Sequence, residues 1–168
     1  MDRETLVTQF GLAHYVVLKN VEGLSHADSL VQPEPGGNCL NWVLGHIVRT
    51  RNEALGLVGK KPLLPVEKFE LYASTPIQDG SRALPFAQLL RDYEALQQPW
   101  IEGLRGMPAQ ALTGPAPFTP TGNPQETVGS LLVAIVFHES YHSGQLGLLR
   151  RLVGKAGVIK PPARAAST

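Results

Sequence analysis

The chain has 168 residues, 43% of them hydrophobic, and a formal net charge of +1, which suits one soluble domain and excludes a disordered or fibrous chain. The balanced charge gives no strong field toward nucleic acid or an anionic membrane surface, and no apolar run is long enough to span a membrane. The first residues do not resemble a signal peptide and the single cysteine, Cys39, cannot form an internal disulfide, so we expect a cytoplasmic protein.

Apolar residues at spacings of three and four predict four helices. The first covers about residues 4–24, and the second runs from an N-cap at Asn38 to about Val58. The third covers residues 85–105, within which Pro99 is expected to kink or break the helix. The fourth covers residues 126–153. No segment alternates with a period of two over enough residues to predict a sheet.

Two long, proline-containing connections separate these helices, at residues 60–84 and 107–124. Both exceed the roughly 2–8 residues that usually join helices in a bundle. The sequence therefore predicts an all-α four-helix bundle with at least one crossover connection, formed by residues 1–154 as a single metal-binding domain. Residues 155–168 are expected to form a flexible tail.

His138 and His142 lie four residues apart on the fourth predicted helix. At about 100° per residue they share one face, and this face is the apolar stripe that also carries Leu131 and Leu149. Two imidazoles in an apolar stripe leave many polar atoms to satisfy, and one shared metal ion would satisfy both. The alternative is a pair of core histidines with separate hydrogen-bond partners.

A third ligand must come from another helix, and His46 lies within the broad apolar arc of the second. Three neutral imidazoles leave a coordination position for water or substrate, as in catalytic rather than structural zinc sites. We therefore predict that His46, His138 and His142 bind one divalent transition metal ion. Three imidazole ligands suit zinc, nickel, copper or iron, so the ligand set leaves the identity of the metal open.

Other residues near these histidines are weaker candidates. Glu139 could act as a catalytic residue beside the metal, but a solvated carboxylate on the helix surface is an equal alternative. His14 could be a fourth ligand, although a half-buried structural histidine is the more common case. Cys39 precedes His46 by about 10.5 Å along the helix axis, which is too far to bind the same ion. His26 is expected to be solvated in a loop.

The segment from His138 to His142 also matches the H-E-x-x-H motif of zinc peptidases. Those enzymes need a further ligand downstream, and no His, Asp or Glu follows His142 in this chain. No sheet is predicted before the helix either. A peptidase is therefore disfavoured.

The far face of the fourth helix carries small and apolar residues, and no charge occurs between Thr127 and Phe137. A helix without a polar face is usually covered on all sides. Either the bundle encloses this face or a second subunit covers it, and we predict a homodimer. The basic residues near the end of the chain lack the interleaved aromatic residues and the length of a nucleic-acid site.

Two motifs together resemble the DinB/YfiT-like superfamily of candidate metalloenzymes. The first is W-x-x-G-H, from Trp42 to His46, and the second is H-x-x-x-H-x-G-Q, from His138 to Gln145. The resemblance extends from the first predicted helix to about Val153. It implies an up-down-down-up bundle, often dimeric, in which the three histidines of these motifs hold zinc, nickel or a similar ion.

The resemblance leaves the activity open, because some members transfer low-molecular-weight thiols and many have no known activity. We favour a metal-dependent enzyme that acts on a small molecule in a thiol S-transferase-like reaction, with a low-molecular-weight thiol as cosubstrate. The alternatives are a metal-dependent hydrolase and a non-enzymatic metal-binding module of the stress response. Arg49 and Arg51 could anchor a charged thiol, but arginines on a helix surface are usually solvated.

Overall fold

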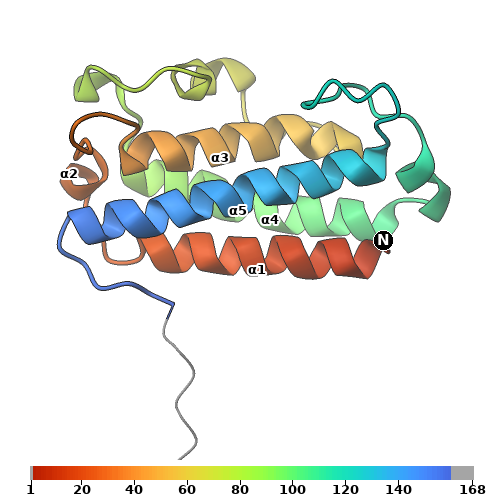
Figure 1. The fold of residues 1–168 in the computed structure, drawn as a ribbon, viewed down its shortest axis with the longest axis horizontal. Helices are drawn as coiled ribbons and strands as arrows, with labels where there is room; N and C mark the ends of the chain where they lie inside the picture. Colours follow the sequence, from red (N-terminus) through yellow and green to blue (C-terminus); the bar gives the residue numbers. More distant parts are fainter. Residues whose placement is uncertain (1, 160–168) are drawn as a thin grey trace, which may run out of the picture.

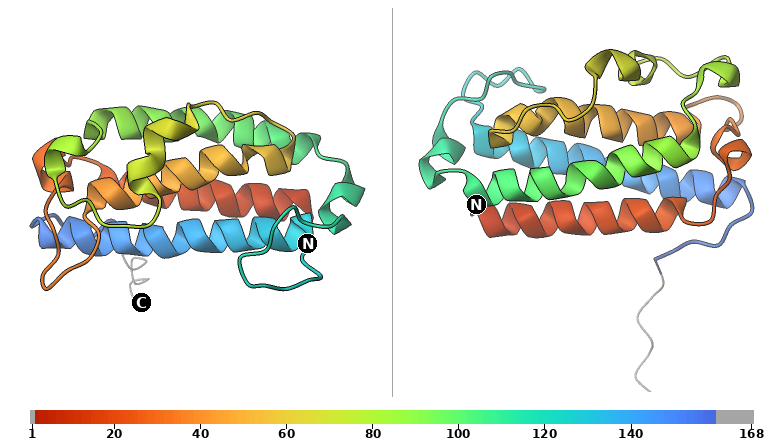
Figure 2. Two further views of the ribbon diagram at one scale, coloured as in Figure 1. Left: turned by 90° about the horizontal axis from the view of Figure 1, so that it is seen from above. Right: turned by 180° about the vertical axis from the view of Figure 1, so that it is seen from behind.

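Four long helices form the body of the protein in a computed structural model that describes residues 2–159 (Figure 1). They are α1 (Arg3–Val21), α3 (Leu40–Ala54), α4 (Phe86–Gly106) and α5 (Val128–Leu152). Helices α1 and α5 run in one direction and α3 and α4 in the other (Figures 1 and 2). Each helix packs against two neighbours, α1 and α3 each contacting both α4 and α5. The predicted all-α bundle with up-down-down-up order is confirmed.

Short helices occupy the connections between the long ones. They are α2 (His26–Ser29) and the 3-10 helices η1 (Leu55–Val58), η2 (Val66–Tyr72), η3 (Gly80–Arg82) and η4 (Ala109–Thr113). Since α3 and α4 are parallel, the chain between them must return along the length of the bundle (Figure 2). This crossover packs η2 on α3 and buries Phe69, Tyr72 and Ile77. The crossover lies on the side of the bundle that is remote from α1, whereas the connection between α4 and α5 covers one end of the bundle and then reaches the same side (Figure 1).

The ends of the helices differ from the predicted ends by a few residues. The N-cap of α3 is Cys39 rather than Asn38, because Cys39 has the extended backbone of a cap and Leu40 the first helical one. No side chain caps this end, whereas Thr127 caps α5 in a reciprocal pair with Ser130. Residues 155–159 continue from α5 as an irregular segment, and the rest of the predicted flexible tail lies outside the described residues.

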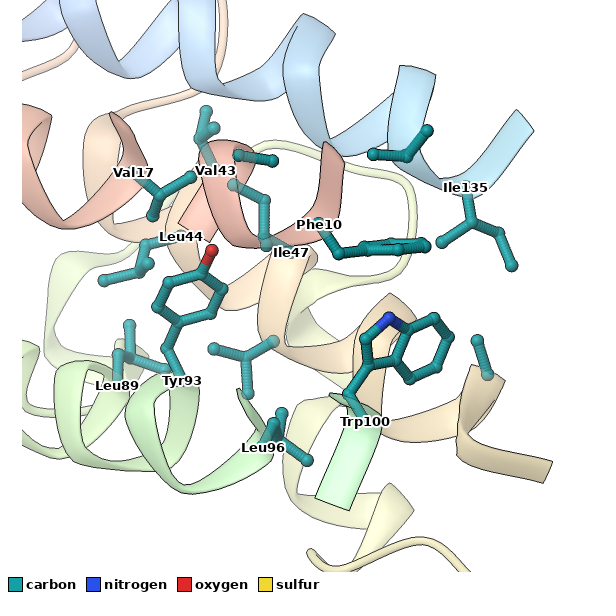
Figure 3. Close-up of a cluster of buried hydrophobic side chains, with 14 of the residues drawn as sticks. Phe10, Val17, Val43, Leu44, Ile47, Leu89, Tyr93, Leu96, Trp100 and Ile135 are labelled. Carbon is teal, nitrogen blue, oxygen red and sulfur yellow. The ribbon is translucent and has the colours of Figure 1, made fainter. Parts of the chain in front are cut away.

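Of the kink or break predicted at Pro99, the break is wrong, because α4 continues through Pro99 to Gly106. The residues on either side explain why packing prevails over the local cost of a proline. Trp100 and Leu96 are fully buried, and the ring of Trp100 meets that of Phe10 edge to face at a centroid distance of 4.9 Å (Figure 3). A break at Pro99 would remove these side chains from the core.

The described part of the chain contains no helix that combines the length and the apolar character needed to cross a membrane.

Candidate metal centre

Three histidines from two helices meet inside the bundle. His46 comes from α3, and His138 and His142 come from successive turns of α5. The Nε2 atom of His138 lies 3.0 Å from Nε2 of His46 and 3.1 Å from Nε2 of His142. The ligand atoms of all three residues lie within 4.8 Å of one another. This geometry differs from that of core histidines with separate partners, because the three imidazoles share one point.

Two hydrogen bonds fix the tautomers of His46 and His142. The Nδ1–H of His46 donates to the carbonyl oxygen of Tyr72 at 2.7 Å, and that of His142 donates to Oε1 of Gln145 at 2.7 Å. A neutral imidazole carries only one N–H, so both Nε2 atoms keep a lone pair that faces His138. Hydrogen bonds to the outer nitrogen of this kind orient metal-binding histidines and raise their basicity.

Burial lowers the pKa of all three imidazoles and so favours their neutral forms. The pKa of His138 falls to about 4, because the neighbouring imidazoles of His142 and His46 add to the effect of burial. Burial also lowers the pKa of His46 and that of His142, although their hydrogen bonds to Tyr72 and Gln145 oppose the change. A neutral imidazole with a free lone pair is the form that binds a metal ion.

Trp42 and Gly45 place His46 and thereby explain the first motif. The indole ring of Trp42 stacks on the imidazole of His46, with centroids 4.7 Å apart and planes inclined by 9°. A Cβ atom at Gly45 would lie 2.2 Å from Cδ1 of Tyr72, so only a glycine lets η2 approach α3 this closely. That approach brings the carbonyl oxygen of Tyr72 to Nδ1 of His46.

We expect Gly45→Ala to destabilise the fold by about 1–3 kcal/mol, because the added methyl group overlaps the buried ring of Tyr72. The matched control is Gly11→Ala in α1, where a Cβ atom would meet nothing within 4 Å. There the higher helix propensity of alanine should stabilise the protein by up to about 1 kcal/mol. Urea unfolding of the metal-free variants measures both changes. Equal effects at the two positions would contradict the steric explanation.

Glu139 and Arg51 form a buried ion pair, so neither takes the solvated position that was expected for Arg51 and was one of two alternatives for Glu139. Their side chains are 3% and 1% exposed. Nη2 of Arg51 donates to the two carboxylate oxygens at 2.6 and 2.9 Å, and Nε donates to Oε2 at 3.1 Å. The hydroxyl of Tyr93 donates to Oε1 at 2.6 Å. Each oxygen thus accepts two hydrogen bonds, so the carboxylate offers no free lone pair for the catalytic role considered above.

His14 belongs to this ion pair rather than to the histidine cluster. Its ring stacks on that of Tyr93 with centroids 4.7 Å apart, and its Nδ1 lies 3.3 Å from Nη1 of Arg51. Burial and the positive charge of Arg51 lower the pKa of His14 to about 4. Within residues 2–159, the group of candidate ligands contains His46, His138 and His142 without His14. Cys39 is likewise outside the group and buried.

We expect the metal-free protein to lose stability as the pH falls from about 7 to about 5. His14 and His138 have a pKa of about 4 in the folded protein, against about 6.5 in an unfolded chain. Between these values the unfolded chain binds more protons, so acid favours unfolding, and above pH ~7 the effect vanishes. Urea unfolding of chelator-treated protein measures the free energy of unfolding over this pH range. In the His14→Phe variant this free energy should depend less steeply on pH. Constant stability would contradict the buried, neutral state of these imidazoles.

The remaining candidates lie at or near the surface. Arg49 follows His46 by about one turn of α3 and pairs with Glu53 at 2.9 Å, with roughly a third of each side chain exposed. The Nε atom of Arg49 is buried and has no hydrogen-bond partner among the described residues. His26 is exposed, as predicted, but it begins α2, and its Nδ1 accepts a hydrogen bond from the backbone of Phe86.

The fold and the histidine cluster together define a four-helix-bundle protein with a candidate metal centre between α3 and α5. The chain belongs to the DinB superfamily, whose family model matches residues 9–146, and the resemblance inferred from the two motifs is thereby confirmed. A crystal structure described as a conserved protein from Enterococcus faecalis shares the fold. It has a TM-score of 0.72 and 21% identity, over 92% of this chain and 99% of that chain. No curated protein matches the chain.

Proposed function

We propose that His46, His138 and His142 bind one divalent transition metal ion, zinc or nickel, and that the protein is a metal-dependent enzyme acting on a small molecule. The observation that carries this proposal is the direction of two fixed lone pairs, on Nε2 of His46 and of His142, toward the third imidazole. Without an ion, a single proton on Nε2 of His138 must serve both lone pairs. The donor set of three neutral imidazoles fits both favoured metals.

Three protein ligands would leave a position for a small molecule, because zinc sites usually have four ligands. A bound ion would lower the pKa of a thiol or of water in that position and so supply a nucleophile at neutral pH. Tyr72 and Gln145 would hold the imidazoles in place through their hydrogen bonds. Arg51 is committed to Glu139, which leaves Arg49, whose side chain is 28% exposed, as the remaining candidate to anchor an anionic group of the substrate.

Thiol transfer is the reaction we favour, because it needs no carboxylate base. In such a transfer the sulfur forms a bond to an electrophilic carbon, the leaving group departs with its electron pair, and the thiol proton passes to solvent. A hydrolase of the H-E-x-x-H type would use the glutamate as a base. Glu139 is enclosed by Arg51 and Tyr93, which supports thiol transfer over that hydrolytic mechanism.

Metal analysis of the purified protein, followed by cobalt substitution, tests the proposal. We expect tight binding of a single ion per chain and a cobalt spectrum that changes on addition of a small thiol or azide. A panel of thiols and electrophiles then tests the reaction. Failure to bind any of these ions would overturn the proposal. A cobalt spectrum that no small ligand changes would indicate a closed site and favour the non-enzymatic module.

We also propose that two copies of the chain associate through the groove between α1 and α5. The groove has a volume of about 750 Å³, and its apolar walls include Leu12 of α1 and Phe137 and Leu148 of α5. These side chains are 62%, 70% and 61% exposed, and exposed apolar side chains that gather in one place favour an interaction site. Gly144, which also lines the groove, has no neighbour that a Cβ atom would meet. Its small size is therefore not required by a single chain, but it suits a closely packed partner helix.

Replacing Leu148 with glutamate should convert the dimer to a monomer, because the charge would be buried without a partner at the interface. Light scattering of the wild type and the variant measures the mass. Leu63→Glu is the matched control, since Leu63 is 52% exposed and lies in the crossover rather than in the groove. A monomeric wild type would contradict the dimer, and a dimeric Leu148→Glu variant would contradict only the assigned face.

A further inference from the structure

A buried polar cluster joins all four long helices and is centred on the ion pair of Arg51 and Glu139. Nη1 of Arg51 donates to Oε1 of Gln97 in α4 at 2.6 Å and lies 3.3 Å from Nδ1 of His14 in α1. Tyr93 of α4 donates to the carboxylate, and its ring centroid lies 4.8 Å from Cζ of Arg51. Arg51 and Glu139 thus contact polar side chains besides each other, and each of the four long helices contributes at least one residue to the cluster.

Stability alone does not explain a buried ion pair. Transfer of the two charges out of water costs several kcal/mol per ion, and a well-packed apolar replacement is often at least as stable. Buried polar pairs are best attested as devices that fix the register between helices. Here a slip of one turn, about 5.4 Å, between α3 and α5 would leave Arg51 and Glu139 buried without each other. The pair therefore selects one axial position of these helices.

The same two helices carry the three histidines. Glu139 directly follows His138 on α5, and Arg51 lies about 7.5 Å beyond His46 along the axis of α3. Because one imidazole comes from α3 and two come from α5, the axial position of α3 on α5 decides whether their Nε2 atoms meet. Within residues 2–159, the pair of Arg51 and Glu139 is the only ion pair between these helices.

We infer that Arg51 and Glu139 are positioning residues, which hold α3 and α5 in the register that brings His46 onto His138 and His142. Glu139 was considered above as a catalytic residue beside the metal. We now assign it a role in placing the three histidines relative to one another. The inference rests on the proposed function where the readout is metal affinity. It also applies to the metal-free protein, because the register between α3 and α5 is set by Arg51 and Glu139 and not by a bound ion.

The test replaces the ion pair and the tyrosine hydroxyl that binds it by apolar groups of similar shape, in a triple variant Arg51→Met, Glu139→Leu and Tyr93→Phe. No charge and no tyrosine hydroxyl is then left buried without a partner. We expect cooperative unfolding and helical circular dichroism to persist, while the zinc affinity falls by about 10–100-fold, as for groups that support metal ligands. The control Arg105→Met with Glu4→Leu removes the 3.5 Å ion pair between α4 and α1, two helices that carry none of the three histidines, and should leave the zinc affinity unchanged.

A second readout does not depend on metal. Long-range proton–nitrogen spectra of the metal-free wild type should show His46 and His142 as Nδ1–H tautomers, and the triple variant should show a mixture of tautomers. If the triple variant does not fold, Glu139→Gln keeps the shape of the side chain but turns an N–H toward Arg51, and the same two measurements apply to it with smaller changes.

The outcomes separate the inference from the proposed function. A folded variant with wild-type zinc affinity and wild-type tautomers would overturn the positioning role. A wild type that binds no zinc or other ion would overturn the proposed function, and the tautomers of the metal-free proteins would then decide the positioning role by themselves.

Discussion

Replacing His138 with alanine should abolish tight zinc binding while the bundle stays folded. His138 is the shared member of the cluster, since its Nε2 lies 3.0 and 3.1 Å from those of His46 and His142. In the proposed site, its loss removes a ligand rather than a group that supports one. The zinc affinity should therefore fall by more than the factor of about 10–100 that is typical of supporting groups. Competition with a coloured chelator measures the affinity.

The matched control for this substitution is His26→Ala. His26 is exposed and lies outside the cluster, so the variant should bind zinc as the wild type does. Circular dichroism should show the same helix content for both variants, which separates loss of a ligand from loss of the fold. A His138→Ala protein with unchanged zinc affinity would show that the ion binds elsewhere, and it would remove the basis of the proposed function.

Replacing Arg51 alone with methionine should cost about 3–5 kcal/mol of folding free energy, because the buried carboxylate of Glu139 then loses its ionic partner. This is a large part of the roughly 5–15 kcal/mol that stabilises a typical domain. Adding Glu139→Leu should restore much of the loss, since the second substitution removes the unpaired charge. Urea unfolding of the single and double variants, combined as a double-mutant cycle, measures the coupling.

Arg49→Met provides the control for Arg51→Met on the same helix. The ion pair of Arg49 with Glu53 is partly exposed and lies within one helix, so its loss should cost less than about 1 kcal/mol. The comparison therefore tests burial, because both substitutions remove an arginine from an ion pair. Equal losses for Arg49→Met and Arg51→Met would contradict the buried state of the Glu139 pair.

The sequence by itself determined the helices, their order and the three histidines. Short stretches of the sequence carry the signal for these features. A helix with one buried face places apolar residues every three or four positions, and His138 and His142 share such a face. His46 could be predicted for the same reason, since it lies within an apolar arc and is part of a motif that ends in His. The motif also contains Gly45, although the reason for this glycine, the ring of Tyr72, is visible only in the fold.

Only the tertiary structure decided how the charged residues near the site are used. Arg51 and Glu139 are separated by 88 residues, and nothing in the local pattern of either helix distinguishes a buried ionic partner from a solvated side chain. The hydrogen bond that fixes His46 could not be predicted from the sequence either. Its acceptor is the backbone carbonyl of Tyr72, a group that every residue possesses. Periodicity reports which face of a helix is buried, whereas the pairing of polar groups across helices depends on packing between segments that are far apart in the chain.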